Sequence, residues 1–150
     1  MGILSDPTKD FVRQQKLGFV ATVCPDGTPN LSPKGTLIAI DDDHLAFLDI
    51  ISPGTIDNLL KNPAIEINVV DFFVRRGYRF KGKAEVLSKG SLYDSILLLY
   101  GDASKKYEIK HIVRIRVERV LEVKSPAYDT GATEAEIERR WIDYWNTIHS

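Results

Sequence analysis

Two groups of residues in the sequence have the types and spacing needed to hold a small anion. Four polar residues alternate along one predicted strand, so their side chains share a face: Asn30, Ser32, Lys34 and Thr36. Ser52 and Thr55 stand where a short helix should begin, and the free N–H groups and dipole of a helix start favour negative charge. These groups would form a phosphate site if the fold brings them together. The alternative is that Ser52 only caps its helix while Lys34 lies in water.

Segment 77–84 fits most of a second phosphate-binding pattern, the P-loop string GxxxxGK followed by Ser or Thr. The pattern fails at its last position, because Ala84 has no hydroxyl for magnesium. The segment also alternates with a period of two residues, whereas a P-loop connects a strand to a helix. We therefore expect no nucleoside triphosphate site here.

The remaining reactive residue types form no catalytic or metal-binding set in the sequence. His44 lies in a turn, His149 lies at the tail, and His111 lies on the apolar phase of a predicted strand, which favours a core role. Cys24 has no histidine near it in the sequence to activate a thiolate. Residues 41–43 are aspartates, but the glycine and distal glutamate of a calcium loop are missing. The sequence therefore predicts no metal site and identifies no catalytic residue.

The composition of the chain restricts its partners. Its 150 residues include 20 Lys and Arg against 21 Asp and Glu, a net charge of −1, which argues against broad binding to nucleic acid or to an anionic membrane. The single cysteine excludes a disulfide framework. A basic cluster at positions 75, 76, 79, 81 and 83 predicts a solvated edge or a small-anion site. We recognise no signal peptide or membrane-spanning segment and expect a cytoplasmic protein.

Turn residues and apolar periodicity divide the chain into short elements. Alternating side chains predict six strands, at about residues 18–23, 30–40, 45–50, 65–69, 78–86 and 109–123. Capping and breaking residues predict helices at about residues 6–17, 52–60, 91–100 and 133–148. In the last strand the apolar phase slips between Val117 and Val120, which predicts a β-bulge. Together these elements predict a single, mainly β domain over residues 1–150, with a six-stranded antiparallel sheet or barrel and helices at its ends.

The predicted C-terminal helix has a large apolar face for the last element of a chain. A capping box at Thr133 and Glu136 predicts where it starts. Its apolar residues recur at helical spacing: Ile137, Trp141, Tyr144, Trp145 and Ile148. This face should either cover one end of the barrel or pack against a second chain.

Five motifs occur in a recognisable order along the chain. They are GFVATV at 18–23, DGTPN at 26–30, SPKG at 32–35, SPGT at 52–55 and RRGYRFKG at 75–82. Together they resemble the pyridoxamine 5′-phosphate oxidase-like family of FMN-binding split barrels, in its short bacterial form. The resemblance covers about residues 8–125, and the segment SPAY at 125–128 is also similar to that subgroup.

The resemblance implies a six-stranded split β-barrel, a homodimer, and FMN held in a groove between the subunits. By position, Ser32 and Lys34 would lie on the strand that meets the FMN phosphate and ribityl chain. Ser52 and Thr55 match the segment that binds the phosphate at a helix start. The strand that borders the isoalloxazine ring carries two further matches, Arg79 and Lys81.

Three departures from the family pattern argue against pyridoxamine phosphate oxidation. The Ser-Arg-Lys phosphate motif of the true oxidases is Ser52-Pro53-Gly54 here, so two cations are absent. Gly77 stands where those enzymes often have a flavin-contacting glutamine, and an acidic amphipathic helix replaces the segment that grips pyridoxal phosphate. The resemblance therefore implies an FMN-dependent oxidoreductase that takes a hydride or two electrons from a reduced nicotinamide or another small organic donor.

Three other functions stay open from the sequence. A non-catalytic FMN-binding or electron-carrier protein would use the same site. A split barrel could instead hold deazaflavin or haem, with His111 as the haem ligand to check, although its core-facing phase argues against that role. A module without a cofactor would contact another protein through Trp141 and Trp145.

Overall fold

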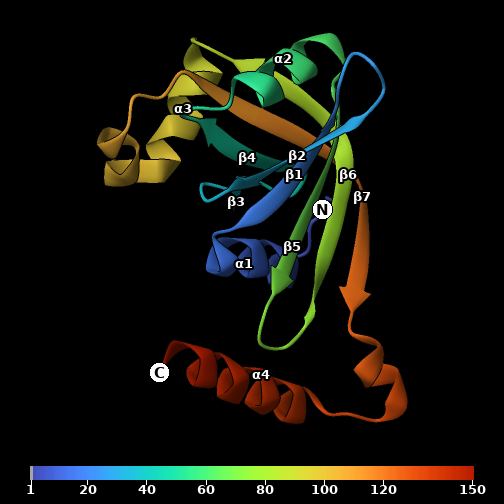
Figure 1. The fold of residues 1–150 in the computed structure, drawn as a ribbon. Coiled ribbons are helices and arrows are strands. Elements are labelled where there is room, and N and C mark those ends of the chain that lie inside the picture. The colour runs from blue at the N-terminus through green and yellow to red at the C-terminus, as the bar shows by residue number, and fades with distance from the viewer. Residues whose placement is uncertain (1) are drawn as a thin grey trace.

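The computed structural model describes residues 2–150 and shows one curled antiparallel sheet with helices around it (Figure 1). Its strands are β1 (Gly18–Val23), β2 (Pro29–Lys34), β3 (Ile38–Ala39), β4 (His44–Asp49), β5 (Ala64–Asp71), β6 (Arg76–Leu87) and β7 (His111–Lys124). They pair in the order β2-β1-β5-β6-β7-β4-β3. The helices are α1 (Asp6–Gln15), α2 (Pro53–Lys61), α3 (Ser91–Tyr100) and α4 (Glu134–His149), with short 3₁₀ segments η1 (Gly101–Lys106) and η2 (Pro126–Thr130). The prediction of a mainly β split barrel is confirmed.

The predicted strand over residues 30–40 is wrong, because a turn at Gly35 and Thr36 divides it into β2 and β3. The two pieces lie at opposite edges of the sheet, which therefore has seven strands instead of six. The Thr36 hydroxyl accepts the Leu48 backbone N–H at 2.9 Å, and the Thr36 carbonyl accepts the Tyr100 hydroxyl at 2.8 Å. Thr36 therefore leaves the polar face of β2 and holds the crossing chain against β4.

A β-bulge bends the two longest strands where the sheet curls. Lys81 of β6 pairs with Arg119 of β7, but the next residue, Gly82, pairs with Val117, so Glu118 has no partner in the ladder. Gly82 approaches β7 so closely that an added Cβ would lie 2.0 Å from a carbonyl oxygen, which makes glycine necessary here. Because bulges bend a strand and increase its twist, this one helps the sheet to close. The bulge predicted from the apolar phase slip is confirmed.

The apolar inner face of the sheet forms the barrel core, and α2 lies across one end of it (Figure 1). The largest fully buried side chains of this core come from several strands and their connections: Phe47, Phe80, Leu37, Leu45, Ile67 and Ile115. From α2, Ile56 and Leu59 join the same cluster. A second cluster lies on the outer face of β4 and β7, where Leu48 packs with Ile96 of α3. Burial of each large apolar side chain contributes about 1.5–3 kcal/mol.

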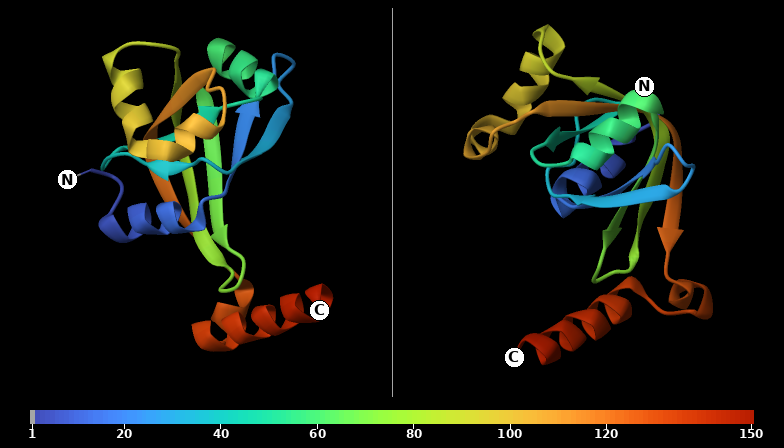
Figure 2. Two further views of the ribbon diagram at one scale, coloured as in Figure 1. Left: turned by 90° about the vertical axis from the view of Figure 1, so that its left-hand side faces the viewer. Right: turned by 45° about the horizontal axis from the view of Figure 1, so that its top comes forward.

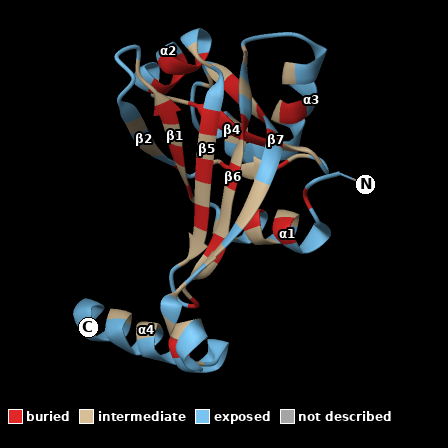
Figure 3. Ribbon diagram, turned by 90° about the vertical axis from the view of Figure 1, so that its right-hand side faces the viewer, coloured by how far each residue is buried: buried red, intermediate tan, exposed pale blue. Residues whose placement is uncertain are grey.

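The C-terminal helix α4 lies apart from the barrel, beyond the hairpin that joins β5 and β6 (Figure 1, Figure 2). The predicted capping box is confirmed, since the Thr133 hydroxyl accepts the Glu136 N–H and the Glu136 carboxylate accepts the Thr133 N–H. Ile137 is buried, but most of the helix is exposed, including Tyr144 and Ile148 (Figure 3). Of the two arrangements predicted for its apolar face, α4 does not cover an end of the barrel (Figure 1, Figure 2), and packing against a second chain stays a prediction. No helix of residues 2–150, α4 included, has the length and apolar character needed to cross a membrane.

Aromatic and basic side chains attach the C-terminal segment to the hairpin. The Arg75 guanidinium lies 3.6 Å from the Trp141 ring centroid, and the Arg76 guanidinium lies 4.7 Å from that of Tyr128. The Tyr128 hydroxyl donates to the Val74 carbonyl at 2.6 Å. Two members of the basic cluster noted in the sequence therefore anchor η2 and α4.

Candidate functional site

The structure brings the two predicted anion-binding groups together at Lys34. This lysine ends β2, is only 7% exposed, and shares the inner face of the strand with Ser32. Its ammonium donates to the Ser32 hydroxyl at 2.7 Å and to the Ser52 hydroxyl at 2.6 Å. The polar strand and the start of α2 therefore converge on one positive charge.

The environment of the Lys34 ammonium is unusual for a buried charge. Among residues 2–150, its hydrogen-bond partners are hydroxyl groups, and no carboxylate lies within ion-pair distance. Burial lowers the pKa of Lys34 below the ordinary value for lysine, and the negative charge of Asp49 opposes part of that shift. A buried ammonium without a paired anion is unfavourable on its own. A bound anion would supply the missing negative charge.

Ser52 and Thr55 mark the start of α2, as the sequence predicted. Ser52 occupies the N-cap position, but its side chain makes no capping hydrogen bond and accepts one from Lys34 instead. The interpretation of Ser52 as only a cap is therefore wrong. Its hydroxyl still has a proton to donate, and Thr55 is buried in the first turn of the helix. An oxygen-rich anion could accept from that hydroxyl and from the first N–H groups of α2.

A histidine–aspartate pair lies on the same inner face, near Lys34. Asp49 ends β4, is 2% exposed, and stands opposite His111 of β7. Asp49 Oδ2 lies 2.7 Å from His111 Nδ1, whereas Asp49 Oδ1 has no hydrogen-bond partner within residues 2–150. Asp49 is not among the site residues predicted from the sequence. The sequence does contain a sign of its importance. Asp49 follows Leu45 and Phe47 at two-residue spacing, so it lies on the buried face of the strand, where a carboxylate is rare.

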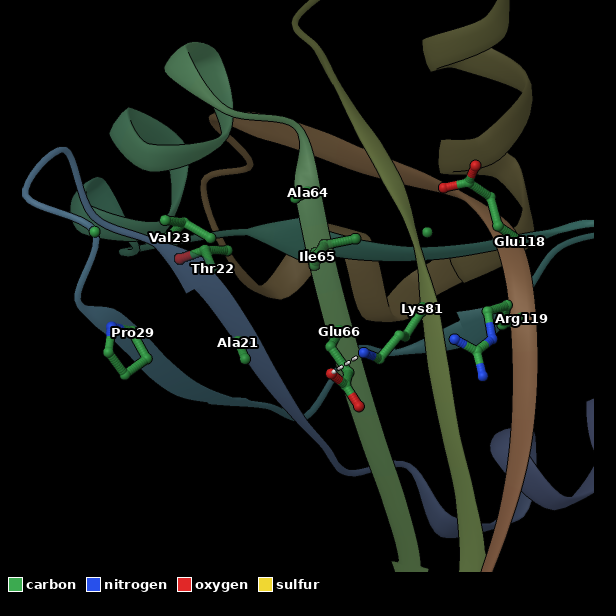
Figure 4. Close-up of a pocket in the computed structure, with 12 residues that line it drawn as sticks. Ala21, Thr22, Val23, Pro29, Ala64, Ile65, Glu66, Lys81, Glu118 and Arg119 are labelled. Atoms are coloured by element: carbon green, nitrogen blue, oxygen red, sulfur yellow. Dashed lines mark ion pairs between the residues drawn. The ribbon is translucent and has the colours of Figure 1, made fainter.

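Arg79 and Lys81 lie on the opposite face of the sheet from Lys34. They flank Phe80, which is fully buried in the core, so alternation along β6 directs both cations outward. Arg79 Nε donates to Glu66 Oε1 at 2.6 Å, and Lys81 Nζ lies 3.6 Å from Glu66 Oε2 (Figure 4). Within one chain, the six predicted site residues therefore form two separate groups.

The outer face around Glu66 is hollowed. A groove of about 500 Å³ opens beside Lys81, and its lining includes Ala21, Val23, Pro29, Ile65 and Arg119 (Figure 4). A neighbouring groove of about 310 Å³ beside Arg79 shares Ala21 and Glu66 and adds Phe19, Leu31 and Val123. Neither groove includes Lys34 or Ser52, so this apolar hollow belongs to the outward-facing group.

The segments set aside at the start have structural roles in the described chain. Residues 77–84 are part of β6 and do not form a P-loop. Cys24 is a free thiol, and Asn58 Nδ2 lies 3.6 Å from its sulfur. Within residues 2–150, no three His, Cys, Asp or Glu side chains are grouped in a way that could hold a metal ion.

Comparisons with known sequences and solved structures identify the family to which the chain belongs. The sequence profile described as pyridoxamine 5′-phosphate oxidase matches residues 4–124. Among solved structures, HupZ of Group A Streptococcus is 31% identical with a TM-score of 0.72, and the match covers 81% of this chain and 95% of that chain. The chain belongs to the pyridoxamine 5′-phosphate oxidase family.

Two further solved structures share the fold of this family member at lower identity. A Lactobacillus delbrueckii protein provisionally called a pyridoxamine 5′-phosphate oxidase is 21% identical, with a TM-score of 0.69 over 81% of this chain and 95% of that chain. An FMN-binding protein of Syntrophomonas wolfei is 18% identical, with a TM-score of 0.67 over 79% of this chain and 84% of that chain. The comparison with curated proteins finds no match. Both η2 and α4 lie outside the matched residues 4–124.

Proposed function

We propose that this member of the pyridoxamine 5′-phosphate oxidase family binds FMN and works as an FMN-dependent oxidoreductase. The strongest support is the buried Lys34 ammonium, which holds the Ser32 and Ser52 hydroxyls at 2.7 and 2.6 Å beside the start of α2. A phosphate monoester carries about −1.5 to −2 charges near neutral pH, and it would supply the negative charge that Lys34 lacks. Thr55 lies in the same helical turn. When bound, FMN would supply a two-electron acceptor for a small organic donor.

We further propose that a second copy of the chain completes the site. Arg79 and Lys81 face away from Lys34 across the sheet, so one chain does not present both groups to one compact ligand. In a homodimer, the phosphate would lie at Lys34 of one copy and the flavin ring beside Arg79 and Lys81 of the other. The apolar outer hollow, with Leu31 67% exposed, offers surface for both the ring and the second copy.

Binding of FMN and riboflavin by a Lys34→Glu variant tests the phosphate assignment. Two unit charges about 4 Å apart interact by on the order of 4 kcal/mol at an effective dielectric constant of about 20. Reversing this charge should therefore weaken FMN binding at least about 100-fold, while riboflavin binding changes by less than about threefold. Quenching of flavin fluorescence measures both affinities. Lys83→Glu is the matched control, because Lys83 is an exposed lysine of β6.

The outcomes of this experiment are distinct. An unchanged FMN affinity in Lys34→Glu contradicts the phosphate assignment, and an equal loss for both flavins places the ring at Lys34 instead. Oxidation of reduced nicotinamides with several electron acceptors then distinguishes an oxidoreductase from a non-catalytic FMN-binding or electron-carrier protein. Light scattering of the FMN-loaded protein measures whether it is a dimer.

A further inference from the structure

The Asp49–His111 pair borders the ammonium of the proposed phosphate site. Asp49 is in phase with Phe47 along β4, and His111 is in phase with Val113 along β7, so both side chains lie on the inner face of the barrel. Lys34 Nζ lies 5.9 Å from the Phe47 ring centroid and interacts electrostatically with Asp49. The core-facing phase that the sequence predicted for His111 therefore places it beside the candidate site.

The charges of these side chains do not suit a phosphate dianion while His111 is neutral. Lys34 and Asp49 form no ion pair within residues 2–150, but their formal charges sum to zero, so the net positive charge offered to a ligand is only the half charge or so from the start of α2. Asp49 cannot turn toward water, because it is 2% exposed and one of its oxygens is held by His111 at 2.7 Å. Protonation of His111 gives the three side chains a net charge of +1. The hydrogen bond to Asp49 then joins two oppositely charged groups.

The imidazole of His111 has one ring nitrogen that can meet a ligand. Asp49 occupies Nδ1, and no protein group within residues 2–150 forms a hydrogen bond with Nε2. The side chain is 32% exposed, so a ligand can reach it. An imidazolium fixed through Nδ1 presents its second N–H as a directed donor, which is the geometry needed to contact a phosphate oxygen.

We propose that His111, oriented by Asp49, is the second cationic ligand of the phosphate site, and that binding of a phosphate monoester is coupled to uptake of a proton by its imidazole. The inference rests on the proposed function, because FMN is the phosphate monoester concerned. It explains how the chain binds phosphate without the two cations that its Ser52-Pro53-Gly54 segment lacks.

In the described chain, the charged groups that bear on His111 lie on several elements. Lys34 comes from β2 and Asp49 from β4, and Asp49 is the only carboxylate within ion-pair distance of His111 in the described chain. Lys110 precedes His111 and donates its backbone N–H to the Asp49 carbonyl at 3.0 Å. Asp57, on α2, is exposed to solvent. The proton uptake therefore depends mainly on Asp49, on Lys34 and on the charge of the ligand.

The pH dependence of FMN binding tests the proposal. From pH 6.5 to 8.5 the FMN affinity should fall about tenfold, the size expected for loss of a hydrogen bond from a charged donor, because histidine ordinarily loses its charge in this range. Riboflavin, which has no phosphate, should show less than about a twofold change. Titration of the ligand acts in the opposite direction, since a phosphate monoester with a second pKa near 6 becomes more anionic as the pH rises.

Two histidine variants show whether His111 causes this pH dependence. His111→Gln keeps a hydrogen-bond donor but cannot take up a proton, so its FMN affinity should be about tenfold weaker at pH 6.5 and nearly constant with pH. His44→Gln is the matched control, because His44 Nδ1 also contacts an aspartate, Asp41 Oδ1, at 2.9 Å. Its pH profile should equal that of the wild type. A fall that persists in His111→Gln would mean that Lys34 titrates instead, and the proposal is then wrong.

A measurement without flavin separates this proposal from the proposed function. In NMR titrations of the two imidazoles, inorganic phosphate should raise the midpoint of His111 by about one pH unit, equivalent to the tenfold coupling, and leave that of His44 unchanged. Lys34→Glu should abolish the shift. A His111 midpoint that does not respond to phosphate overturns the proposal even if FMN binds at Lys34. A phosphate-linked shift without FMN binding supports it and contradicts only the flavin assignment.

Discussion

The two faces of one sheet hold positive charge in opposite ways. On the inner face, Lys34 is 7% exposed, and its hydrogen-bond partners within residues 2–150 are hydroxyl groups. On the outer face, the side chains of Arg79 and Lys81 are each 43% exposed and share the carboxylate of Glu66. Both sets of cations come from strands of the same barrel. The inner and outer cations therefore differ in their solvent exposure and in the groups that they contact, and not in the sign of their charge.

Within residues 2–150, the inner cation has no ion-pair partner, whereas the two outer cations share one. Burial lowers the pKa of Lys34, so the fold itself disfavours the charged form, and a bound phosphate would reverse that preference. The outer cations are already neutralised locally, and exposed ion pairs of this kind contribute only about 0–1 kcal/mol each. Under the proposed function, binding of a phosphate accounts for the buried inner charge. The outer charges lie on the surface that the proposed dimer would use.

The contrast between the inner and outer faces predicts its largest difference in stability for neighbouring residues on β6. Phe80→Ala should lower the free energy of unfolding by about 3–5 kcal/mol, because Phe80 is fully buried in the barrel core. Arg79→Ala and Lys81→Ala should each change it by less than about 1 kcal/mol, since their ion pairs with Glu66 are exposed. Urea unfolding measures all three. If an outward variant is destabilised as much as Phe80→Ala, the outer group is part of the structural core and the comparison fails.

Much of the fold could be predicted because its signals are local. Alternation and turn residues located most of the strands, and the phase slip near Val117 predicted the bulge that the register confirms. The division of residues 30–40 was missed because polar residues continue to alternate through Gly35 up to Thr36. What ends β2 is a distant interaction, in which Thr36 bonds to Leu48 and Tyr100. Partners 12 and 64 residues away leave no local pattern.

The candidate site was likewise predictable only where its residues show a local pattern in the sequence. Ser32, Lys34 and Ser52 could be grouped from residue types alone, although their contact depends on strand pairing that the sequence does not display. The family resemblance implied that Arg79 and Lys81 contact the same FMN molecule as Lys34. Alternation already implied that they lie on the face opposite Phe80, but only the register between β5 and β6 shows that Glu66 pairs with them.

One part of the outer face is covered by α3 and is not exposed to solvent. Substitution of Tyr100, a residue of α3, tests this covered part. Its hydroxyl donates to the carbonyls of Thr36 at 2.8 Å and Ala46 at 3.2 Å, and burial raises its pKa well above the usual value for tyrosine. Tyr100→Phe should lower the free energy of unfolding by about 1 kcal/mol at pH 7. Because the folded pKa exceeds the unfolded value of about 10, the wild type should lose stability as the pH rises above 10, by up to about 1.4 kcal/mol per unit.

The difference between wild type and Tyr100→Phe should therefore shrink when unfolding is measured at pH 10.5 instead of pH 7. This sign follows because the unfolded chain releases the tyrosine proton first, whereas the folded chain retains it. A difference that stays the same at both pH values would show that Tyr100 is solvated. The covered and open parts of the outer face would then not differ in the way described.

The smallest expected effect on stability comes from Glu66, the carboxylate that Arg79 and Lys81 share. Glu66→Gln should lower the free energy of unfolding by less than about 1 kcal/mol at low ionic strength, and this loss should disappear in about 1 M salt. If the flavin ring lies at the outer face, the variant should change FMN and riboflavin affinities by the same factor, within about threefold. Lys34→Glu, by contrast, should affect FMN alone. A Glu66→Gln effect confined to FMN would place the phosphate on the outer face and reverse the roles of the two faces.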